Sequence, residues 1–481
     1  DDSPARRRLA YDELLAGQLA LLLMRLHMKR DNGLARPSDG ALVKKILSLL
    51  PYQLTGAQHQ ALADISRDLH APERMLRLLQ GDVGSGKTIV AFIAMAQVVE
   101  AGFQAAMMVP TEILARQHYQ RLLPLAEQAG LRMGLLTGRD KGKTRKLLLD
   151  RLATGDLDLI IGTHALFQED VIFKALGLAV IDEQHRFGVH QRLALSRKGK
   201  AVDVLVMTAT PIPRTLVLTY FGDMDISLLR EKPAGRQPID TRIISLERVD
   251  EVMEGLKRAL QSEQQIYWIC PLVEENEELD LTDVNARFQS LRNQFGAQVG
   301  LLHGQMPAQD KDAAMHDFSS GTTRILVATT VVEVGVDVPK ASIMVIEHAE
   351  QFGLSQLHQL RGRIGRGSAK STCLLLYGPK SSAMARARLD VMRQSEDGFF
   401  IAEEDLRLRG EGDILGTRQS GMPGFRFALP THHARLLNRA RDEAKLILNK
   451  DPHLQTPRGE ALRLLLYLFE RDAAIRWVKA G

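Results

Sequence analysis

A chain of 481 residues with a formal net charge of +5 is too long for a single hydrophobic core, so about two or three domains are expected. Its 45% hydrophobic and 25% charged residues are ordinary for a soluble globular protein, and the mild basicity permits a polyanionic partner without identifying one. The two cysteines, Cys270 and Cys373, lie in apolar strand-like runs, which argues against a disulfide or metal site and fits small buried thiols in a reducing cytoplasm.

Residues 1–48 carry apolar side chains at helical spacing, with a polar break at 30–40. The most apolar stretch, residues 14–28, falls short of the ~20 apolar residues of a membrane span. It also lacks the long apolar run and cleavage site of a signal peptide, so an amphipathic helix is predicted. Because residue 1 is Asp and not Met, we expect that an upstream segment has been removed.

From Pro51 onward the sequence alternates between apolar runs and helical patterns. The runs are continuous in Val, Ile and Leu, which predicts strands buried on both faces of a parallel sheet. The first series of predicted strands covers residues 76–80, 105–109, 133–137, 157–162, 178–182 and 202–208. The helices predicted between them cover residues 89–100, 112–129 and 144–153.

A second series follows a Pro-, Gly- and charge-rich stretch at residues 231–238, which is interpreted as a linker. Its predicted strands cover residues 241–246, 265–271, 299–302, 325–328, 343–346 and 372–377. The predicted fold class is therefore α/β, with two tandem doubly wound parallel-sheet lobes and ligand sites outside the carboxyl ends of the strands. Only the first lobe has a phosphate-loop sequence, so one nucleotide site is expected at the cleft between the lobes.

After residue 377 the strand pattern ends. Residues 381–393 are predicted to form a basic helix, and residues 431–480 are helical again. Residues 406–421, taken by themselves, are interpreted as a charged loop broken by glycines. The domains expected from the whole pattern are an N-terminal helical connector (1–50), a first, nucleotide-binding lobe (51–230), a second lobe (231–380) and a helical C-terminal segment (381–481).

The strongest chemical signal is GDVGSGKT at Gly81–Thr88, between a predicted strand and an apolar helix. Its glycines let backbone N–H groups surround phosphates, Lys87 can reach the terminal phosphates, and the Thr88 hydroxyl can bind Mg²⁺. A glycine loop that only caps a helix is the weaker alternative. The nucleotide-binding candidates in this loop are Gly81, Gly84, Ser85, Gly86, Lys87 and Thr88.

A second motif, DEQH, begins at Asp182 directly after the apolar run 178–181. At a strand end Asp182 can hold Mg²⁺, and Glu183 beside it can orient or deprotonate an attacking water. A solvated acidic turn is the alternative, but the preceding strand and the upstream phosphate loop argue against it. Together the two motifs favour a nucleotide hydrolase over a passive nucleotide binder.

The second lobe offers groups that can sense a phosphate. QLRGRIGRG, residues 359–367, contains three arginines, and Arg363 and Arg366 are candidates for fingers that stabilise charge across a cleft. A basic surface turn is the alternative. Asp337 follows a predicted strand and a glycine, so it can accept a hydrogen bond from a ribose, although a structural turn carboxylate is equally simple.

Threonines stand at several strand ends of the first lobe. Thr111 and Thr163 can contact a nucleic-acid backbone without reading bases, and helix capping is the alternative that can hold at the same time. TATPIPRT, from Thr208, closes the last predicted strand near Asp182. Its hydroxyls can link the nucleotide state to the second lobe.

In chain order, GDVGSGKT, PTEILA, IGTHAL, DEQH, TATPIPRT, LLHGQM, TTVVEVGVDVP and QLHQLRGRIGRG resemble the motor of a superfamily 2 helicase. DEQHRFGVHQR, TATPIPRTL and LRGEGDILGTRQSG narrow the resemblance to the RecG family of bacterial branched-DNA helicases. It extends from about Arg8 to near the C-terminus. It implies RecA-like lobes, ATP and Mg²⁺ as cofactors, and translocation on duplex DNA that remodels stalled replication forks and Holliday junctions in recombination and repair.

The resemblance also implies residue roles. Lys87 and Thr88 would bind phosphate and Mg²⁺, and Asp182 and Glu183 would serve the metal and the water. The remaining nucleotide contacts implied are fingers at Arg363 and Arg366, an adenine contact at Gln58, and contacts at Gly335 and to the ribose at Asp337. The residues implied to couple hydrolysis to DNA are His185, Thr208, Thr210 and Gln359. Those implied to contact DNA or drive translocation are Thr111, Thr163, Arg407, Arg409 and Gln419, the last three within a translocation motif after a helical hairpin.

The sequence departs from the family at its start. The family carries an N-terminal wedge domain that splits the arms of a junction, and the residues before Pro51 lack its many short strands. We therefore expect a motor without the wedge, which hydrolyses ATP and binds duplex DNA but has weak junction specificity. The expected partners are branched and duplex DNA, with single-stranded DNA-binding protein as a further candidate. A monomer in the cytoplasm, without membrane association, is expected.

Three alternatives are open at this point. The transcription-repair coupling translocase shares the motor, but it usually has an acidic residue where this chain has Gln184. A small-molecule phosphotransferase shares the phosphate loop but needs no second lobe with Arg363 and Arg366. A nucleotide-gated DNA clamp that binds without turnover is disfavoured by Glu183.

Overall fold

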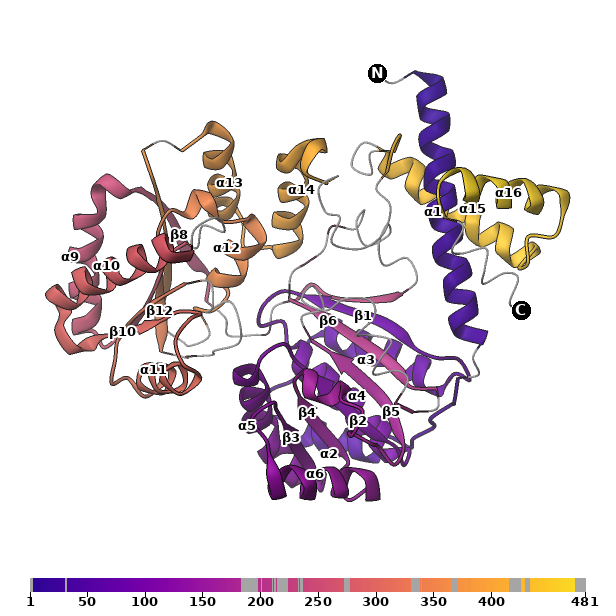
Figure 1. Cartoon of the computed structure of the whole chain (residues 1–481), viewed down its shortest axis with the longest axis horizontal. Helices are drawn as coiled ribbons and strands as arrows, with labels where there is room; N and C mark the ends of the chain where they lie inside the picture. The colour runs from indigo at the N-terminus through magenta and orange to yellow at the C-terminus, as the bar shows by residue number, and fades with distance from the viewer. Residues whose placement is uncertain are drawn as a thin grey trace.

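The structure, a computed structural model, describes residues 3–30, 33–182, 198–199, 201–209, 211, 213, 224–231, 233, 237–271, 277–329, 338, 340–365, 370–379, 381–414, 425–428 and 433–471. These residues form two parallel sheets with their covering helices, and a third group of helices drawn from both ends of the chain (Figure 1). The predicted α/β fold with two doubly wound lobes is confirmed.

The first lobe contains a seven-stranded parallel sheet in the order β3-β4-β2-β5-β6-β1-β7. Its strands are β1 (Leu76–Gly81), β2 (Gln104–Met108), β3 (Met133–Leu136), β4 (Leu159–Gly162), β5 (Leu176–Ile181), β6 (Asp203–Thr208) and β7 (Asp225–Leu229). Six of the seven match predicted runs. The strand β7 was not predicted, because it is a short edge strand with an exposed residue between buried ones and lacks the continuous apolar pattern.

Helices cover both faces of this sheet. They are α2 (Ala41–Leu49), α3 (Gly56–His70), α4 (Lys87–Glu100), α5 (Glu112–Ala129) and α6 (Gly142–Thr154). Successive residues of β5 alternate between two apolar clusters, with Leu178 and Val180 in one and Ala179 and Ile181 in the other. Both faces of the strand are therefore buried, which explains its unbroken apolar sequence.

The second lobe contains a six-stranded parallel sheet in the order β10-β11-β9-β12-β13-β8. Its strands are β8 (Ile239–Ser245), β9 (Gln265–Ile269), β10 (Val299–Leu302), β11 (Ile325–Ala328), β12 (Ala341–Ile346) and β13 (Ser371–Tyr377). Its helices are α9 (Val249–Gln261), α10 (Glu277–Phe295), α11 (Ala308–Ser320) and α12 (Leu354–Arg361). All six strands were predicted.

The C-terminal part is helical. Its elements are α13 (Ala383–Gln394), α14 (Gly398–Ile414), α15 (Ala434–Lys450) and α16 (Pro457–Leu468). The interpretation of residues 406–421 as a loop is wrong for 406–414, which continue α14. The apolar residues at the start of α14, such as Ile401 and Ala402, are buried. Their packing stabilises the first turns, and the helix then propagates into the charged residues that follow.

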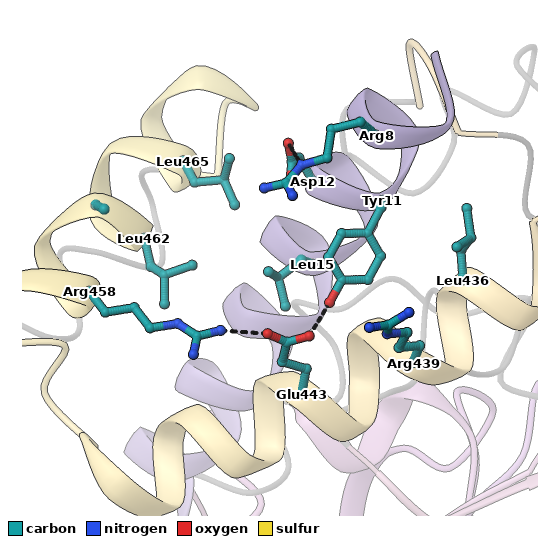
Figure 2. Close-up of a pocket in the computed structure, with 11 residues that line it drawn as sticks. Arg8, Tyr11, Asp12, Leu15, Leu436, Arg439, Glu443, Arg458, Leu462 and Leu465 are labelled. Atoms are coloured by element: carbon teal, nitrogen blue, oxygen red, sulfur yellow. Dashed lines mark hydrogen bonds and ion pairs between the residues drawn. The ribbon is translucent and has the colours of Figure 1, made fainter. Parts of the chain in front are cut away.

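The first helix of the chain, α1 (Pro4–Arg30), packs against α15 and α16 although they lie at the other end of the sequence (Figure 1). Figure 2 shows the polar side of this packing, where Glu443 of α15 accepts hydrogen bonds from Tyr11 of α1 and Arg458 of α16. The buried Glu13 carboxylate accepts backbone N–H groups from residues 426, 427 and 428. The two ends of the chain therefore share one core.

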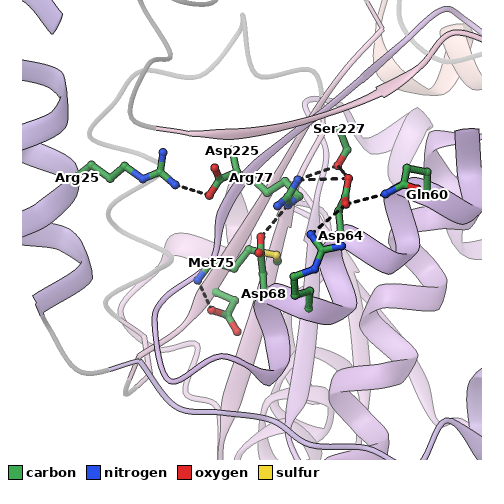
Figure 3. A network of polar contacts seen from close by, with 10 residues as sticks. Arg25, Gln60, Asp64, Asp68, Met75, Arg77, Asp225 and Ser227 are labelled. Carbon is green, nitrogen blue, oxygen red and sulfur yellow. Dashed lines mark hydrogen bonds and ion pairs between the residues drawn. The ribbon is translucent and has the colours of Figure 1, made fainter. Parts of the chain in front are cut away.

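A polar network joins α1 to the first lobe (Figure 3). Arg25 of α1 pairs with Asp225 of β7. Arg77 of β1 donates to Asp68 of α3 at 2.8 Å and to Ser227 of β7 at 2.9 Å. These contacts fix the edge of the sheet beside the strand that leads into the phosphate-loop sequence.

The segment between α1 and α2 is anchored by a buried ion pair. Arg36 donates to Asp203, at the start of β6, and both side chains are 1% exposed. Arg36 also donates to the carbonyl of Ala201, and Asp203 accepts the N–H of Met75 at 2.7 Å. Burial raises the pKa of Asp203 to about 7, although the positive charge of Arg36 opposes the rise.

Both cysteines are free and buried, as predicted. Burial raises the pKa of Cys373 to about 12, so this thiol is held in its neutral form. Within the described ranges, the structure contains no helix with the length and apolar character needed to cross a membrane.

Candidate nucleotide and nucleic-acid site

The sequence GDVGSGKT forms a tight loop between β1 and α4. Gly84 and Gly86 have φ values of 79° and 84°, in the left-handed region that favours glycine. A Cβ atom on Gly86 would lie 2.2 Å from Nε2 of Gln58, so no other residue fits there without a shift. The loop delivers the chain to the amino end of α4, where backbone N–H groups have no helical partners and can bind an anion.

Three polar side chains of the loop lie at or next to the first turn of α4. The buried Nζ of Lys87 donates to the carbonyls of Gly81 at 2.6 Å and Asp82 at 2.8 Å. Ser85 Oγ is buried and has no hydrogen-bond partner in the part of the chain that the structure describes. Thr88 is half-buried in the first turn of α4. A buried hydroxyl without a partner is costly, which fits a site that a ligand completes.

Gln58 lies directly against this loop. Its Nε2 donates to the carbonyl of Ser85 at 2.8 Å, and its Oε1 accepts the N–H of Thr55 at 2.9 Å. Thr55 and Gln58 form a capping box at the start of α3. The helix α3 was not predicted, although the T-x-x-Q spacing of Thr55 and Gln58 is a signal for its start.

The strand ends next to the loop bring further candidates together. Since β5, β6 and β1 are neighbours in the sheet, Asp182 after β5 and Thr208 at the end of β6 share the edge with the phosphate loop. Asp182 is buried, and its Oδ2 lies 3.3 Å from Nε2 of His118 on α5. His118 was not singled out by its sequence, because it is one polar residue among several on an amphipathic helix.

The second lobe meets the phosphate loop through α12 and the turn that follows it. A Cβ atom on Gly362 would lie 2.7 Å from Cβ of Val83, so Gly362 packs closely against the Val83 side chain. Gln359 is buried in α12, and Arg363 is half-buried one residue after Gly362. The structure therefore brings the arginine-containing turn to the loop.

Arg361, the first arginine of this segment, has an internal role. It is 2% exposed and donates to the carbonyl of Met392 and to Nδ1 of His358, the latter at 3.1 Å. His358 Nε2 in turn lies 2.8 Å from Oδ1 of Asp82 in the phosphate loop. Burial alone would raise the pKa of Asp82, but the hydrogen bonds from His358 and from the N–H of Gly398, together with the positive charge of Lys87, lower this pKa below its usual value.

The threonines proposed to contact DNA lie at the carboxyl ends of neighbouring strands, β2 and β4. Thr111 Oγ1 accepts the N–H of Leu114 at 3.4 Å, so the capping alternative holds for this residue. Thr163 precedes the short 3-10 helix η1 (His164–Phe167) without capping it, and within the described residues its buried Oγ1 has no partner. Arg407 is exposed on α14 and pairs with Glu404 at 2.7 Å.

Other predicted site residues lie outside the described residues. They are Glu183, His185, Thr210, Gly335, Asp337, Arg366 and Gln419, together with the side chain of Arg409.

Comparison with known families gives three matches along the chain. Residues 55–218 match the DEAD/DEAH box helicase family, and residues 247–368 match the helicase conserved C-terminal domain. Residues 395–479 match the C-terminal part of domain 3 of the ATP-dependent DNA helicase RecG. The first two matches fall on the two sheets, and the third begins just before α14.

Curated relatives agree with these matches. The ATP-dependent DNA helicase RecG of Bacillus subtilis is 47% identical over 462 residues, which are 95% of this chain and 68% of that protein. RecG of Synechocystis is 49% identical over 94% of this chain and 55% of the relative, and RecG of Acidithiobacillus ferridurans 49% over 93% and 66%. The chain thus spans between about half and two thirds of the length of these relatives.

Solved structures show the same likeness. A structure of RecG bound to a three-way DNA junction superposes with a TM-score of 0.75 at 42% identity, over 90% of this chain and 57% of that one. The helicase MrfA bound to DNA shares only the fold, with a TM-score of 0.56 at 14% identity, over 83% of this chain and 61% of that one.

Proposed function

Because this chain belongs to the RecG family of ATP-dependent DNA helicases, we propose that it hydrolyses ATP to move along duplex DNA and so remodels branched DNA such as stalled replication forks and Holliday junctions. The observation that carries the proposal is the contact between Val83 of the phosphate loop and Gly362 of the second lobe. A nucleotide in this loop would lie beside the arginine-containing turn. Its hydrolysis can then change the fit between the lobes.

The proposed roles in ATP binding follow from the donors and acceptors at the sheet edge. Lys87 would turn from the loop carbonyls to the terminal phosphates, and backbone N–H groups of the loop would bind the others. Thr88 and Asp182 would hold Mg²⁺, which suits them because this ion usually takes one or two protein oxygens and fills its sphere with phosphates and water. Bound Mg²⁺ would neutralise charge that develops on the phosphates.

We propose the remaining residue roles on the same basis. Glu183 would orient the attacking water, Arg363 and Arg366 would stabilise the transition state, and Gln58 and Asp337 would contact the adenosine. His185, Thr208, Thr210 and Gln359 would couple the site to DNA. Duplex contacts would come from Thr111, Thr163, Arg407, Arg409 and Gln419.

We also propose the wider assignments made from the sequence. The motor would occupy residues 51–380, between the connector (1–50) and the C-terminal segment (381–481) with its translocation motif. A cytoplasmic monomer is proposed, and single-stranded DNA-binding protein remains a candidate partner.

The proposed function is tested by ATPase measurements with and without branched duplex DNA. We expect DNA to raise the rate several-fold, because lobe closure would depend on both ligands. Phosphate transfer to a metabolite in place of water would favour a phosphotransferase. ATP binding without turnover, with or without DNA, would support a nucleotide-gated clamp.

Glu183→Gln is expected to lower ATP turnover at least about 100-fold, the usual size of a general-base contribution, while nucleotide affinity stays within about threefold. Glutamine keeps the shape of the side chain but cannot accept the proton. Steady-state ATPase and binding of a fluorescent ATP analogue measure the two quantities. Turnover at the parent rate would remove Glu183 from the mechanism.

Arg366→Ala is expected to lower kcat about 1000-fold or more with a much smaller change in ATP affinity, because an arginine finger acts mainly in the transition state. Arg242→Ala is the matched control, since Arg242 is exposed on β8, where it pairs with Asp240 at 2.7 Å. Normal hydrolysis by the Arg366 variant would leave Arg363 as the candidate finger.

A further inference from the structure

The first turn of α14 docks on the phosphate loop. The backbone N–H of Gly398, the first residue of α14, donates to Oδ2 of Asp82 at 3.1 Å. The other carboxylate oxygen of Asp82 faces Nε2 of His358 at 2.8 Å. One buried carboxylate of the loop therefore binds the second lobe and the C-terminal segment at once.

The packing around Gly398 leaves no room for a side chain. A Cβ atom on Gly398 would lie 1.9 Å from Oδ1 of Asp82 and 2.6 Å from Nε2 of His358. The guanidinium of Arg230 lies over the ring of the next residue, Phe399, with 5.2 Å between Cζ of Arg230 and the centroid of the ring. Since Arg230 directly follows β7, the first lobe holds the start of α14 through two independent contacts.

The ring of His358 is held in one tautomer. Arg361 can only donate, so Nδ1 of His358 must accept its hydrogen bond, and the proton resides on Nε2, facing Asp82. Arg361 is itself fixed by the carbonyl of Met392 at the end of α13. A buried donor aimed at a carboxylate makes a charge-assisted hydrogen bond, and such bonds are sensitive to small displacements.

Lys87 connects this junction to the nucleotide. Its Nζ donates to the backbone carbonyl of Asp82, the same residue whose side chain binds Gly398. When the ammonium group turns to a terminal phosphate, the Asp82 carbonyl loses that donor, and its peptide group can shift. A shift of Asp82 would change the position of the carboxylate to which the first residue of α14, Gly398, is hydrogen-bonded.

We propose that Asp82 is a positioning residue that transmits the state of the phosphate loop directly to α14, in addition to any signal through the arginine fingers. The inference rests on the proposed function, because α14 leads into the segment that resembles the translocation motif. The contact would convert phosphate binding into a displacement of the helix that carries Arg407. Its loss should separate ATP hydrolysis from movement on DNA.

The test is Gly398→Ala, whose methyl group cannot fit beside Asp82. Gly255→Ala in α9 is the matched control, because a Cβ there meets nothing within 4 Å. ATPase on duplex DNA and displacement of a triplex-forming strand are measured on the same preparations. We expect ATPase within threefold of the parent chain and strand displacement at least tenfold slower, so that more ATP is consumed for each base pair travelled.

A second variant guards against misfolding. Phe399→Leu keeps an apolar side chain but removes the ring under Arg230, and we expect displacement to slow about threefold at unchanged ATPase. Thermal unfolding of both variants and the control establishes folding. Displacement at the parent rate in both variants, or ATPase and displacement reduced in equal proportion, would overturn the inference. Failure of the proposed function is distinct, because the parent chain itself would then show no DNA-stimulated ATPase and no strand displacement.

Discussion

Lys87→Ala is expected to lose ATP binding and to lower turnover at least about 100-fold, the size typical for removing one preorganised electrostatic donor. The effect is large because the ammonium group is a full positive charge buried in the loop, where the carbonyls of Gly81 and Asp82 hold it until it turns to the terminal phosphates. Equilibrium binding of an ATP analogue and steady-state ATPase measure the two losses.

Two further variants test whether the loss comes from removing the charge of Lys87. Lys87→Met keeps the buried aliphatic stem and removes the charge, so it should behave like the alanine variant in both assays. Lys257→Ala on α9 is the surface control, because Lys257 is exposed and pairs with Glu254 one turn away. If Lys87→Met hydrolysed ATP normally, the charge would have no part in the reaction.

Arg36→Met is expected to lower the free energy of unfolding by about 3–5 kcal/mol, the usual cost of removing one partner from a buried ion pair. The variant leaves Asp203 without its guanidinium at a site that is 1% exposed. Urea unfolding followed by circular dichroism measures the loss. Arg248→Met is the control, since the exposed Arg248–Glu251 pair should contribute at most about 1 kcal/mol.

The cost of Arg36→Met should grow with pH. Burial already raises the folded-state pKa of Asp203 above its ordinary value of 3.8, and removing the positive charge raises it further. The native state then keeps a proton that the unfolded chain releases, so stability is retained at low pH and lost as the pH rises through the folded-state value. Unfolding at about pH 5 and about pH 8 measures this slope. The double variant Arg36→Met/Asp203→Asn should be more stable than Arg36→Met at the higher pH.

Most of the fold could be predicted because its strands are buried on both faces. Such strands, like β5, have unbroken apolar sequences, so they can be recognised without knowledge of contacts that are distant in the sequence. β7 escaped because an edge strand is half exposed and lacks that pattern. The second half of α14 was predicted as a loop because residues 406–414 contain glycines and many charged residues. The buried first turns of α14, which a local pattern does not reveal, stabilise the whole helix.

The candidate site divides in the same way. The loop at Gly81–Thr88 is contiguous in the sequence, so its residue types and spacing were enough to predict it. The junction of Asp82, His358 and Gly398 was not predictable, because it forms only when two lobes and the C-terminal segment come together. Gln58 is intermediate, since its capping box with Thr55 was readable locally but its contact with the loop was not.

The shared core of α1, α15 and α16 has a practical consequence for anyone who trims this chain. Leu14 and Leu19 of α1 are covered by the C-terminal helices, with Leu437 and Ala440 among their cluster partners. Deleting either α1 or the C-terminal helices would expose the apolar side chains that the other contributes to this core, and an exposed apolar surface of this kind promotes aggregation. A shortened version should therefore lose both ends together or neither.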